Sequence, residues 1–293
     1  MYVLSVRQGS DLAGSSYAIA KAFASHHTIT VRSAVRLTNY LDYPHDLAWS
    51  QLADEWPHAD VVHLHENAKP RRILGDKPFV MHLHGTVFRR NVDLFRRYIA
   101  DNGGVGVAAT LDLLDLEPSL TWLPHPISRD MLPKRRVTGG RLLRVAHAPT
   151  NRAIKSTEAF LTACRLVGVE PVLIEGKTNA ECLAIKATCD ALYDQTELGY
   201  GVNAIEAWAL GLPVIAGGAP STLTRMRAEF GQLPFIETTA DTIADALAVL
   251  LDDQDRATWA ETGHAHYERF HDGAETVRRL APMYESLAVR SHP

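Results

Sequence analysis

The sequence predicts an α/β protein with two domains, each built on a parallel β-sheet. Short apolar runs alternate with longer segments of helical periodicity along the whole chain, and strands separated by helices pair in parallel through right-handed crossovers. The length of 293 residues is about that of two average domains. The alternation stops in a charged, glycine-rich segment at residues 133–141 and then starts again, so we expect a linker there.

The elements of the first half follow from these patterns. A helix is expected over Ser15–Ser25, where apolar residues recur at helical spacing. Strands are expected at Tyr2–Val6, Thr28–Val31, Asp60–His65, Pro78–His84 and Gly104–Ala109. Gly104-x-Gly106-x-x-Ala109 matches the dinucleotide-binding fingerprint as a string. Because it lies inside a predicted strand instead of following one, we interpret it as part of that strand.

The second half repeats the alternation. Strands are expected at Leu142–His147, Pro171–Ile174, Ala191–Tyr193 and Pro213–Ala216. Helices are expected at Ser156–Val167, Asn203–Leu210, Ala240–Leu251, Arg256–Phe270 and Ala274–Val289. The last three helices are amphipathic, so each is expected to bury one face.

The composition excludes several classes of protein. Apolar residues make up 46% and charged residues 22%, as in a folded globular chain and unlike a disordered one. Cys164, Cys182 and Cys189 form no Cys-x-x-Cys pair and are too few for a disulfide scaffold, so we expect a cytoplasmic location. We find no signal-peptide pattern and no apolar stretch of 18 residues, and we expect no membrane span.

The two halves of the chain differ in charge. Residues 1–144 carry 18 basic and 14 acidic residues (+4), and the remainder carries 12 and 20 (−8), for a total of −4. Charges of opposite sign suggest different ligands for the two domains. Because ligands of open α/β sheets bind beyond the carboxyl ends of the strands, the residues that follow each strand are the candidates for function.

The segment after the first strand contains glycines and leads into a helix. Gly9 and Gly14 would let the backbone approach a ligand, and the helix N-terminus attracts an anion. A simple turn with Ser15 or Ser16 as the N-cap explains the same residues. The sequence leaves both interpretations open.

Two His-x-His pairs lie at the ends of two predicted strands, at residues 63–65 and 82–84. Alternate residues of a strand share a face, so the two pairs could hold a metal ion, with oxygen ligands from Glu66 and Asp76. No cluster of histidine and acid follows at a third strand end. We therefore favour polar strand ends that line a cleft over a metal site.

Four arginines form two pairs seven residues apart in one predicted helix. They are Arg89 and Arg90, and Arg96 and Arg97. This spacing places both pairs on one helix face, two turns apart. The pairs could bind a phosphate-rich acceptor, such as a lipid headgroup, a glycan phosphate or a nucleic acid. We favour the simpler interpretation of a solvated helix face.

The strongest group of polar residues lies in the second half. Arg152 and Lys155 follow a predicted strand at the start of a helix, where cations neutralise a pyrophosphate. Gly199 and Gly201 form a turn into the helix that carries Glu206. The Glu206 carboxylate could accept two ribose hydroxyls, and it needs a partner because its neighbours are apolar.

These segments resemble the GT-B-fold glycosyltransferases of glycosyltransferase family 4 over nearly the whole chain. The similar segments are Asp60–His65, Pro78–Thr86, Trp122–Ile127, His147–Thr157 and Gly199–Ile215, of which the last is the most specific. The family pattern places a first glutamate eight positions before Glu206. This chain has Leu198 there, with Glu197 one position away.

The resemblance implies a GT-B fold. We expect two Rossmann-like parallel-sheet domains that face a cleft, with the C-terminal helix crossing back to the first domain. The expected limits are residues 1–138 for the acceptor-side domain, 139–273 for the donor domain and 274–293 for the helix.

The resemblance also implies an activity. It is the transfer of a hexosyl or pentosyl group from a UDP or GDP sugar to the hydroxyl of a glycan, lipid, protein or modified nucleic acid. Retention of anomeric configuration is expected, with no metal and no cofactor. The implied catalytic residues are His84, Arg152 and Lys155. Donor binding is expected at Gly14, Arg152, Lys155, Gly199, Tyr200, Gly201 and Glu206, and binding of an anionic acceptor at His63, His65, Arg89, Arg90, Arg96 and Arg97.

Two other functions compete with this one. The first is a metal-dependent hydrolase that uses His63, His65, His82 and His84. The second is a catalytically silent module that binds a sugar nucleotide, because the first glutamate of the family pattern is missing.

Overall fold

The computed structural model describes residues 1–10, 13–37, 43–135 and 143–290, and the chain divides into two compact units. Unit 1 comprises Met1–Ser128 and Phe270–Pro293, and unit 2 comprises Arg129–Arg269. The boundary expected after residue 138 lies outside the described residues, as does most of the linker expected at residues 133–141.

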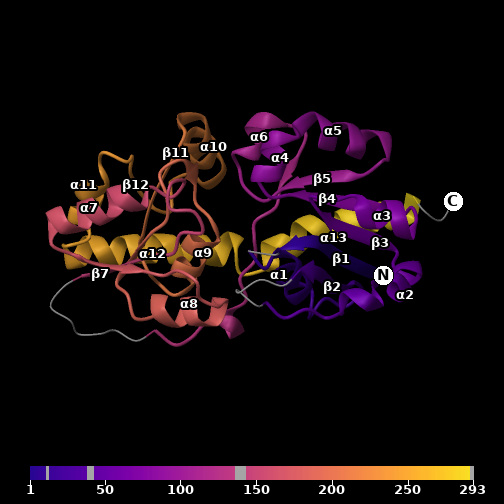
Figure 1. Cartoon of the computed structure of the whole chain (residues 1–293), viewed down its shortest axis with the longest axis horizontal. Coiled ribbons are helices and arrows are strands. Elements are labelled where there is room, and N and C mark those ends of the chain that lie inside the picture. The colour runs from indigo at the N-terminus through magenta and orange to yellow at the C-terminus, as the bar shows by residue number, and fades with distance from the viewer. Residues whose placement is uncertain (11–12, 38–42, 136–142, 291–293) are drawn as a thin grey trace. The chain divides into compact units, whose positions relative to one another are not determined.

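Unit 1 is built on a six-stranded parallel sheet with the strand order β2-β1-β3-β4-β5-β6 (Figure 1). Its strands are β1 (Tyr2–Ser10), β2 (Thr30–Leu37), β3 (Val61–His65), β4 (Phe79–Leu83), β5 (Val105–Ala108) and β6 (Thr121–Trp122). Its helices are α1 (Ser15–Ala22), α2 (Leu52–Glu55), α3 (Lys69–Leu74), α4 (Thr86–Arg90), α5 (Val92–Asp101), α6 (Leu113–Leu116) and α13 (Ala274–Arg290). Short 3-10 turns lie at Trp49–Gln51 and Trp56–His58.

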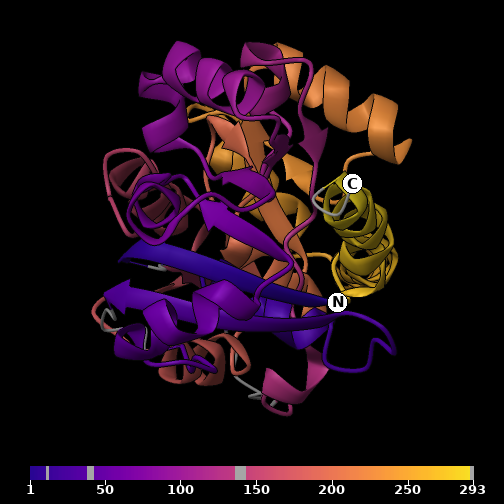
Figure 2. The same cartoon turned by 90° about the vertical axis from the view of Figure 1, so that its right-hand side faces the viewer.

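Both faces of this sheet are buried, which explains why its strands are nearly continuous apolar runs. Leu64 and Met81 belong to the apolar cluster on one face. Val61 and Val80 belong to the cluster on the other face, together with Leu280 and other residues of α13. The C-terminal helix, yellow in Figures 1 and 2, thus packs on the sheet of unit 1 as the resemblance implies.

Unit 2 is built on a second sheet, with the strand order β10-β11-β9-β7-β8 and β12 paired to β11. Its strands are β7 (Arg144–His147), β8 (Glu170–Leu173), β9 (Ala191–Tyr193), β10 (Leu198–Gly199), β11 (Val214–Gly218) and β12 (Ile236–Glu237). Its helices are α7 (Thr157–Val167), α8 (Asn179–Lys186), α9 (Val202–Ala209), α10 (Pro220–Phe230), α11 (Ile243–Val249) and α12 (Asp253–Phe270), after a 3-10 turn at Arg129–Met131. All pairs are parallel except β10 with β11.

Helices α2, α3, α6, α8 and α10 lie where the sequence analysis expects none. Three of them, α2, α3 and α6, have only four to six residues, which is too short for a helical period to show. A local signal for α8 is nevertheless present. Thr178 accepts a hydrogen bond from the backbone N–H of Glu181, whose side chain accepts from the N–H of Thr178, and this reciprocal capping box is readable in sequence.

The prediction of one continuous helix that carries the four arginines is wrong. It is interrupted at Asn91, whose φ of −139° ends α4 and begins α5. The amide of Asn91 donates to the backbone carbonyl of Val87 at 2.8 Å, so the side chain competes with helix continuation. The two arginine pairs therefore lie on two different helices.

The dinucleotide-like string lies in β5 and its preceding turn, as expected. A Cβ on Gly104 would lie 2.2 Å from the Phe79 ring, and a Cβ on Gly106 would lie 2.5 Å from Leu120. Both glycines are therefore required for packing. Throughout the described part of the chain, every helix is too short or too polar to cross the apolar core of a bilayer.

Candidate functional site

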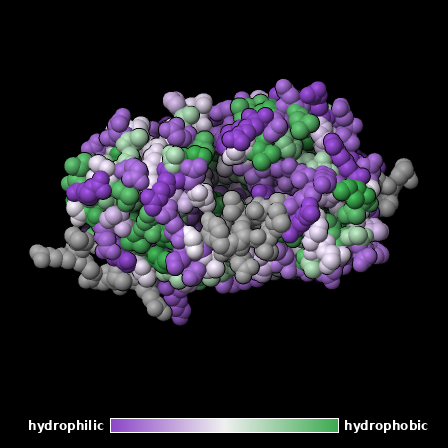
Figure 3. All heavy atoms as spheres, viewed as in Figure 1, coloured by the Kyte–Doolittle hydropathy of each residue, from purple (hydrophilic) through white to green (hydrophobic). Residues whose placement is uncertain are grey.

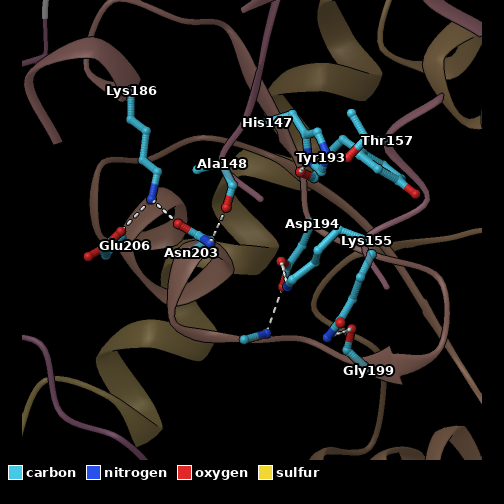
Figure 4. A network of polar contacts seen from close by, with 12 residues as sticks. His147, Ala148, Lys155, Thr157, Lys186, Tyr193, Asp194, Gly199, Asn203 and Glu206 are labelled. Atoms are coloured by element: carbon cyan, nitrogen blue, oxygen red, sulfur yellow. Dashed lines mark hydrogen bonds and ion pairs between the residues drawn. The ribbon is translucent and has the colours of Figure 1, made fainter. Parts of the chain in front are cut away.

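In unit 2, Lys155 and Gly201 meet at one carboxylate. Asp194 directly follows β9, and its Oδ1 lies 2.6 Å from the Lys155 ammonium. Its Oδ2 accepts a 2.6 Å hydrogen bond from the backbone N–H of Gly201, the N-cap of α9 (Figure 4). A cation and a helix N-terminal N–H thus converge on a single anionic group, at the carboxyl edge of the sheet.

The turn before α9 requires a glycine at position 199 and is most open at Gly201. Gly199 has a φ of +79°, and a Cβ there would lie 2.2 Å from the end of the Met226 side chain. A Cβ on Gly201 would lie 3.5 Å from Asp194 Oδ2 and 3.7 Å from Lys155 Nζ, so a larger side chain would crowd both charged groups. Because residue 201 is glycine, no side chain lies between its backbone and the pair formed by Lys155 and Asp194.

Tyr200, which the resemblance places in donor binding, is buried in the core of unit 2. Its hydroxyl lies 3.2 Å from His266 Nε2, and its ring packs edge-on against Trp208. The side chain thus anchors the glycine turn to the helices behind it. A contact from residue 200 to a ligand would come from its backbone.

Glu206 lies on α9 and is 3% exposed, and Figure 4 shows it beside Lys186. Its carboxylate forms an ion pair with the fully buried Lys186 of α8. The amide of Asn179 donates to Oε1 at 2.8 Å. Burial alone would lower the pKa of Lys186, but the charge of Glu206 raises it above its ordinary value, so the ammonium stays charged.

Asn203 extends this pair towards β7. Its Oδ1 accepts from the Lys186 ammonium at 2.6 Å, and its amide donates to the Ala148 carbonyl at 2.9 Å, just beyond the strand. The buried charges are therefore connected to the segment that leads to Lys155. The sequence analysis predicted that Glu206 needs a partner, but it missed Lys186 because α8 was not expected.

Arg152 does not join Lys155. Its guanidinium donates to both carboxylate oxygens of Glu175, at 2.9 and 2.7 Å, and it also contacts Glu158. The Arg152 side chain is half-exposed, and its hydrogen bonds hold the pKa of Glu175 below the ordinary value. The two cations expected to share one site are thus paired with different acids.

His147, the last residue of β7, is part of the scaffold. Its Nδ1 lies 3.1 Å from the Tyr193 carbonyl and its Nε2 lies 2.8 Å from the Thr157 hydroxyl (Figure 4). Burial lowers its pKa to about 4, so the ring is neutral at pH 7. It ties the ends of two strands to the start of α7.

In unit 1, four histidines form one cluster at the ends of β3 and β4. His63 Nε2 lies 3.1 Å from His82 Nδ1, and His65 Nδ1 lies 2.8 Å from His84 Nε2. Burial is the main cause that lowers the pKa of all four rings well below the usual range for histidine. The four rings are therefore neutral at pH 7 and form two hydrogen-bonded pairs.

Three of these rings could in principle hold a metal ion. Ring nitrogens of His63, His65 and His82 lie within 4.8 Å of one another in the described residues. Five of their six nitrogens already take part in hydrogen bonds, with Tyr284, Ser5 and neighbouring histidines as partners. The buried His82 Nε2 has no hydrogen-bond partner. A metal would have to displace most of these bonds, so the donor set fits a hydrogen-bonded cluster better.

Glu66, the residue after β3, holds the loop that begins with His84. Its Oε1 accepts from the backbone N–H groups of His84, Gly85 and Phe88, at 2.8, 3.1 and 3.3 Å. Glu66 adopts a left-handed φ of +52° to do so. The sequence analysis considered Glu66 only as a metal ligand, whereas its carboxylate binds the start of α4.

Two of the four predicted acceptor-binding arginines are neutralised by acids. Arg89 donates to Asp112, and Arg96 pairs with Glu117. Arg97 donates to the Asp93 carbonyl at 3.2 Å. Figure 3 shows hydrophilic and hydrophobic residues side by side over α4, α5 and α6, which is the pattern of an ordinary solvated surface.

Gly14 is the N-cap of α1, with a φ of +63°. A Cβ there would lie 2.6 Å from the Tyr43 ring, so the glycine allows close packing. Ser15 and Ser16, the N-caps considered from the sequence, are instead the first buried residues of α1. Asp11 and Leu12 of the same loop lie outside the described residues.

A groove of about 290 Å³ lies among α3, α4 and α5 of unit 1. Lys69 and Arg72 line it together with Leu94, Phe95 and Tyr98. Arg72 lies over the Tyr98 ring, 5.5 Å from its centroid, and Leu94 is 56% exposed. In the described part of the chain, no acidic side chain forms an ion pair with Lys69 or Arg72. The sequence analysis missed this groove because it did not expect α3.

The sequence matches no family model and no curated protein. Solved structures do match it. HepE from Anabaena, crystallised with UDP and glucose, is 13% identical with a TM-score of 0.74, and the match covers 98% of this chain and 100% of that one.

The chain has the GT-B fold. Two further glycosyltransferases agree with this: one from Rickettsia africae (11% identity, TM-score 0.66, 98% of each chain covered) and SnogD from Streptomyces nogalater (16%, 0.51, 97% and 100% covered). At these identities the likeness establishes the GT-B fold alone. Residue roles must come from the geometry of the two units.

Proposed function

We propose that this protein is a glycosyltransferase that moves a sugar from a nucleoside-diphosphate sugar to an acceptor hydroxyl. The neighbour HepE was crystallised with UDP and with UDP-glucose, and we propose a uridine donor for this chain by analogy. The observation that carries the proposal is the convergence of the Lys155 ammonium and the Gly201 N–H on Asp194.

This arrangement suits a diphosphate. An ammonium group has three hydrogens, and Asp194 is the partner of one of them, so two are available to phosphate oxygens within the described residues. The Gly201 N–H begins α9 and adds the positive end of the helix dipole. The Gly201 N–H itself is donated to Asp194, so the Lys155 ammonium and this dipole would stabilise the charge that develops on the leaving diphosphate. Loss of one such stabilising donor typically costs about 100-fold in rate.

Glu206 is the proposed ribose ligand. A carboxylate has about four lone-pair sites, and Asn179 and Lys186 use one each. The remaining sites can accept ribose hydroxyls. The pair with Lys186 keeps the carboxylate ionised, and an ionised acceptor binds hydroxyls more strongly than a neutral one.

We propose that transfer retains the anomeric configuration and needs no metal ion. Lys155 and Arg152 supply positive charge of the kind that a divalent cation provides in metal-dependent transferases. His84 of unit 1 is the proposed contact to a substrate oxygen, as the resemblance implies. Arg152 would have to exchange Glu175 for phosphate, so Lys155 is expected to contribute more.

The proposed acceptor is anionic and binds the groove among α3, α4 and α5. Among the described residues Lys69 and Arg72 form no ion pair, whereas Arg89 and Arg96 are already paired. Glu66 also lines the groove, but its carboxylate accepts from the N–H groups of His84 and Gly85. The exposed Leu94 and the Tyr98 ring add apolar surface. An acceptor with an acidic group beside a sugar face or an apolar chain fits this lining.

Calorimetric titration tests the donor. We expect UDP and UDP-glucose to bind and GDP to bind more weakly, with no change when EDTA is added. Lys155→Ala should weaken UDP binding by about 100-fold, because a charged hydrogen bond contributes up to about 3 kcal/mol. Lys177→Ala is the matched control, since Lys177 is half-exposed and its ion-pair partner among the described residues is Glu181 of α8. Equal affinity of both variants for UDP would contradict the proposal.

A further inference from the structure

The His84 ring is held by a directed chain of hydrogen bonds. The single hydroxyl hydrogen of Ser16 is shared between the carbonyl and the hydroxyl oxygens of Ser5, which lie 2.8 and 3.0 Å from Ser16 Oγ. Ser5 Oγ in turn lies 3.0 Å from His65 Nε2, and His65 Nδ1 lies 2.8 Å from His84 Nε2. The planes of the two imidazoles differ by 15°, so this last bond lies close to both ring planes.

The order of donors sets the tautomers along this chain. Ser5 Oγ accepts from Ser16, and within the described residues His65 Nε2 is the acceptor that remains for the Ser5 hydrogen, so satisfying this buried hydroxyl makes Nε2 an acceptor. A neutral imidazole carries one hydrogen, so His65 carries it on Nδ1 and donates it to His84 Nε2. His84 must therefore carry its hydrogen on Nδ1.

The chain stays neutral for a physical reason. Burial is the largest cause that lowers the pKa of both His65 and His84, and the positive charge of Arg7 adds to it. Neither ring then gains the second hydrogen that would reverse a bond in the chain.

The backbone of His84 is held from the same strand end. Glu66, next to His65, accepts hydrogen bonds from the N–H groups of His84 and Gly85. Gly85 has a φ of +138°, and a Cβ there would lie 2.7 Å from the Arg89 guanidinium. Residues 65 and 66 thus constrain the ring and the backbone of residue 84 independently.

We propose that His65 is a positioning residue that locks His84 in the Nδ1–H tautomer, so that His84 presents a hydrogen-bond donor to substrate and does not act as a general base. In the described part of the chain no residue bonds to His84 Nδ1, and the His84 side chain is half-buried, so this N–H is available. The role of His84 in catalysis rests on the proposed function, whereas the assignment of its tautomer does not depend on that function.

Two isosteric substitutions separate the two ends of His65. The amide nitrogen of an asparagine takes the place of imidazole Nδ1, and that of a glutamine takes the place of Nε2. His65→Asn therefore keeps a donor towards His84, and His65→Gln keeps only the contact with Ser5. Comparing their melting temperatures shows whether either change is merely structural.

Nitrogen-15 NMR of histidine side chains is the direct test, with His84→Gln used to assign the His84 signals. We expect protonated Nδ1 and unprotonated Nε2 at His84 in the wild type and in His65→Asn. In His65→Gln we expect a mixture, because free imidazole favours the Nε2–H form. A wild-type His84 protonated on Nε2, or an unchanged His84 spectrum in His65→Gln, would overturn the proposal.

Kinetics test the catalytic consequence. With UDP-glucose as donor, His65→Gln should lower kcat by about 10-fold or more with little change in donor KM, as for other groups that orient a reacting side chain. His65→Asn should retain most of kcat. Equal kcat in the two variants would refute the positioning role. Absence of UDP-glucose binding to the wild type would instead refute the proposed function, and the NMR result would still decide the tautomer.

Discussion

The buried ion pair of Lys186 and Glu206 is the residue-scale feature on which the proposed donor site depends most. Both side chains are removed from water, at 0% and 4% exposure, and Asn179 and Asn203 complete their hydrogen bonds. Burying two charges costs hydration energy that their attraction mainly offsets. The pair therefore fixes the position of the Glu206 carboxylate more than it adds to the free energy of unfolding.

The pair predicts an asymmetric response to mutation. Lys186→Met should lower the free energy of unfolding by about 3–5 kcal/mol, because the Glu206 carboxylate is left buried without its cation. The double variant Lys186→Met with Glu206→Gln removes both charges and should recover much of that loss. Urea denaturation measures both variants. A double variant as unstable as the single one would contradict the assignment of an ion pair.

Glu206 also links this pair to donor binding. Glu206→Gln keeps the shape and one hydrogen-bond acceptor but removes the charge, so we expect it to weaken UDP binding by about 10-fold. UMP and uridine should lose affinity by the same factor, since each carries the ribose. Titration with uridine checks this, and a loss confined to the diphosphate would place Glu206 away from the ribose.

At the scale of elements, the break between α4 and α5 changes the interpretation of the arginine pairs. Arg89 and Arg90 are neighbours in sequence but differ in environment. Arg89 donates to Asp112, whose side chain is only 10% exposed, whereas Arg90 is exposed. Arg89 thus connects α4 to the loop after β5, and no comparable contact of Arg90 is found among the described residues.

This difference gives a matched pair of variants. Arg89→Gln should lower the free energy of unfolding by about 1–2 kcal/mol, because it leaves the nearly buried Asp112 without its cation. Arg90→Gln should change it by less than about 0.5 kcal/mol, as expected for an exposed side chain. Equal effects in urea denaturation would show that the Arg89–Asp112 contact is not maintained in solution.

At the scale of the whole molecule, neutral buried histidines couple folding to pH. Burial lowers the pKa of His63 and His271 to about 3 and that of His125 to about 4, all in unit 1. The unfolded chain binds protons at these positions below about pH 6.5, and the folded unit does not. Their contribution to stability is complete above pH 6.5 and is lost as the pH falls towards 4 for His125 and towards 3 for His63 and His271.

We therefore expect steep acid destabilisation. Each such histidine costs about 1.4 kcal/mol per pH unit below its unfolded pKa. Urea denaturation at pH 7.5, 6 and 5 measures the slope. His271→Gln should make it shallower, and His58→Gln should not, because His58 is exposed. An unchanged slope in His271→Gln would show that this histidine titrates normally in the folded protein.

The sequence by itself determined the elements whose signals are local. Apolar runs located nine of the described strands, because a strand buried on both faces must be apolar along its length. The two-residue strands β6, β10 and β12 were missed because they are too short to show a pattern. The segment Gly199–Ile215 identified the glycine turn, the helix with Glu206 and the strand after it. Helix α8 could also have been predicted from the capping box at Thr178, although its apolar periodicity is too weak to indicate a helix.

Only the tertiary structure decided the partners of the charged and polar groups. Lys155 and Asp194 are 39 residues apart, and His63 and Tyr284 are 221 apart. Such pairs depend on strand order and on which helix packs on which face, and neither is encoded in local spacing. For the same reason, Arg152 pairs with Glu175 instead of sharing a site with Lys155. The two His-x-His pairs likewise form a hydrogen-bonded cluster. Buried polar groups need hydrogen-bond partners, and the tertiary fold determines which groups become partners.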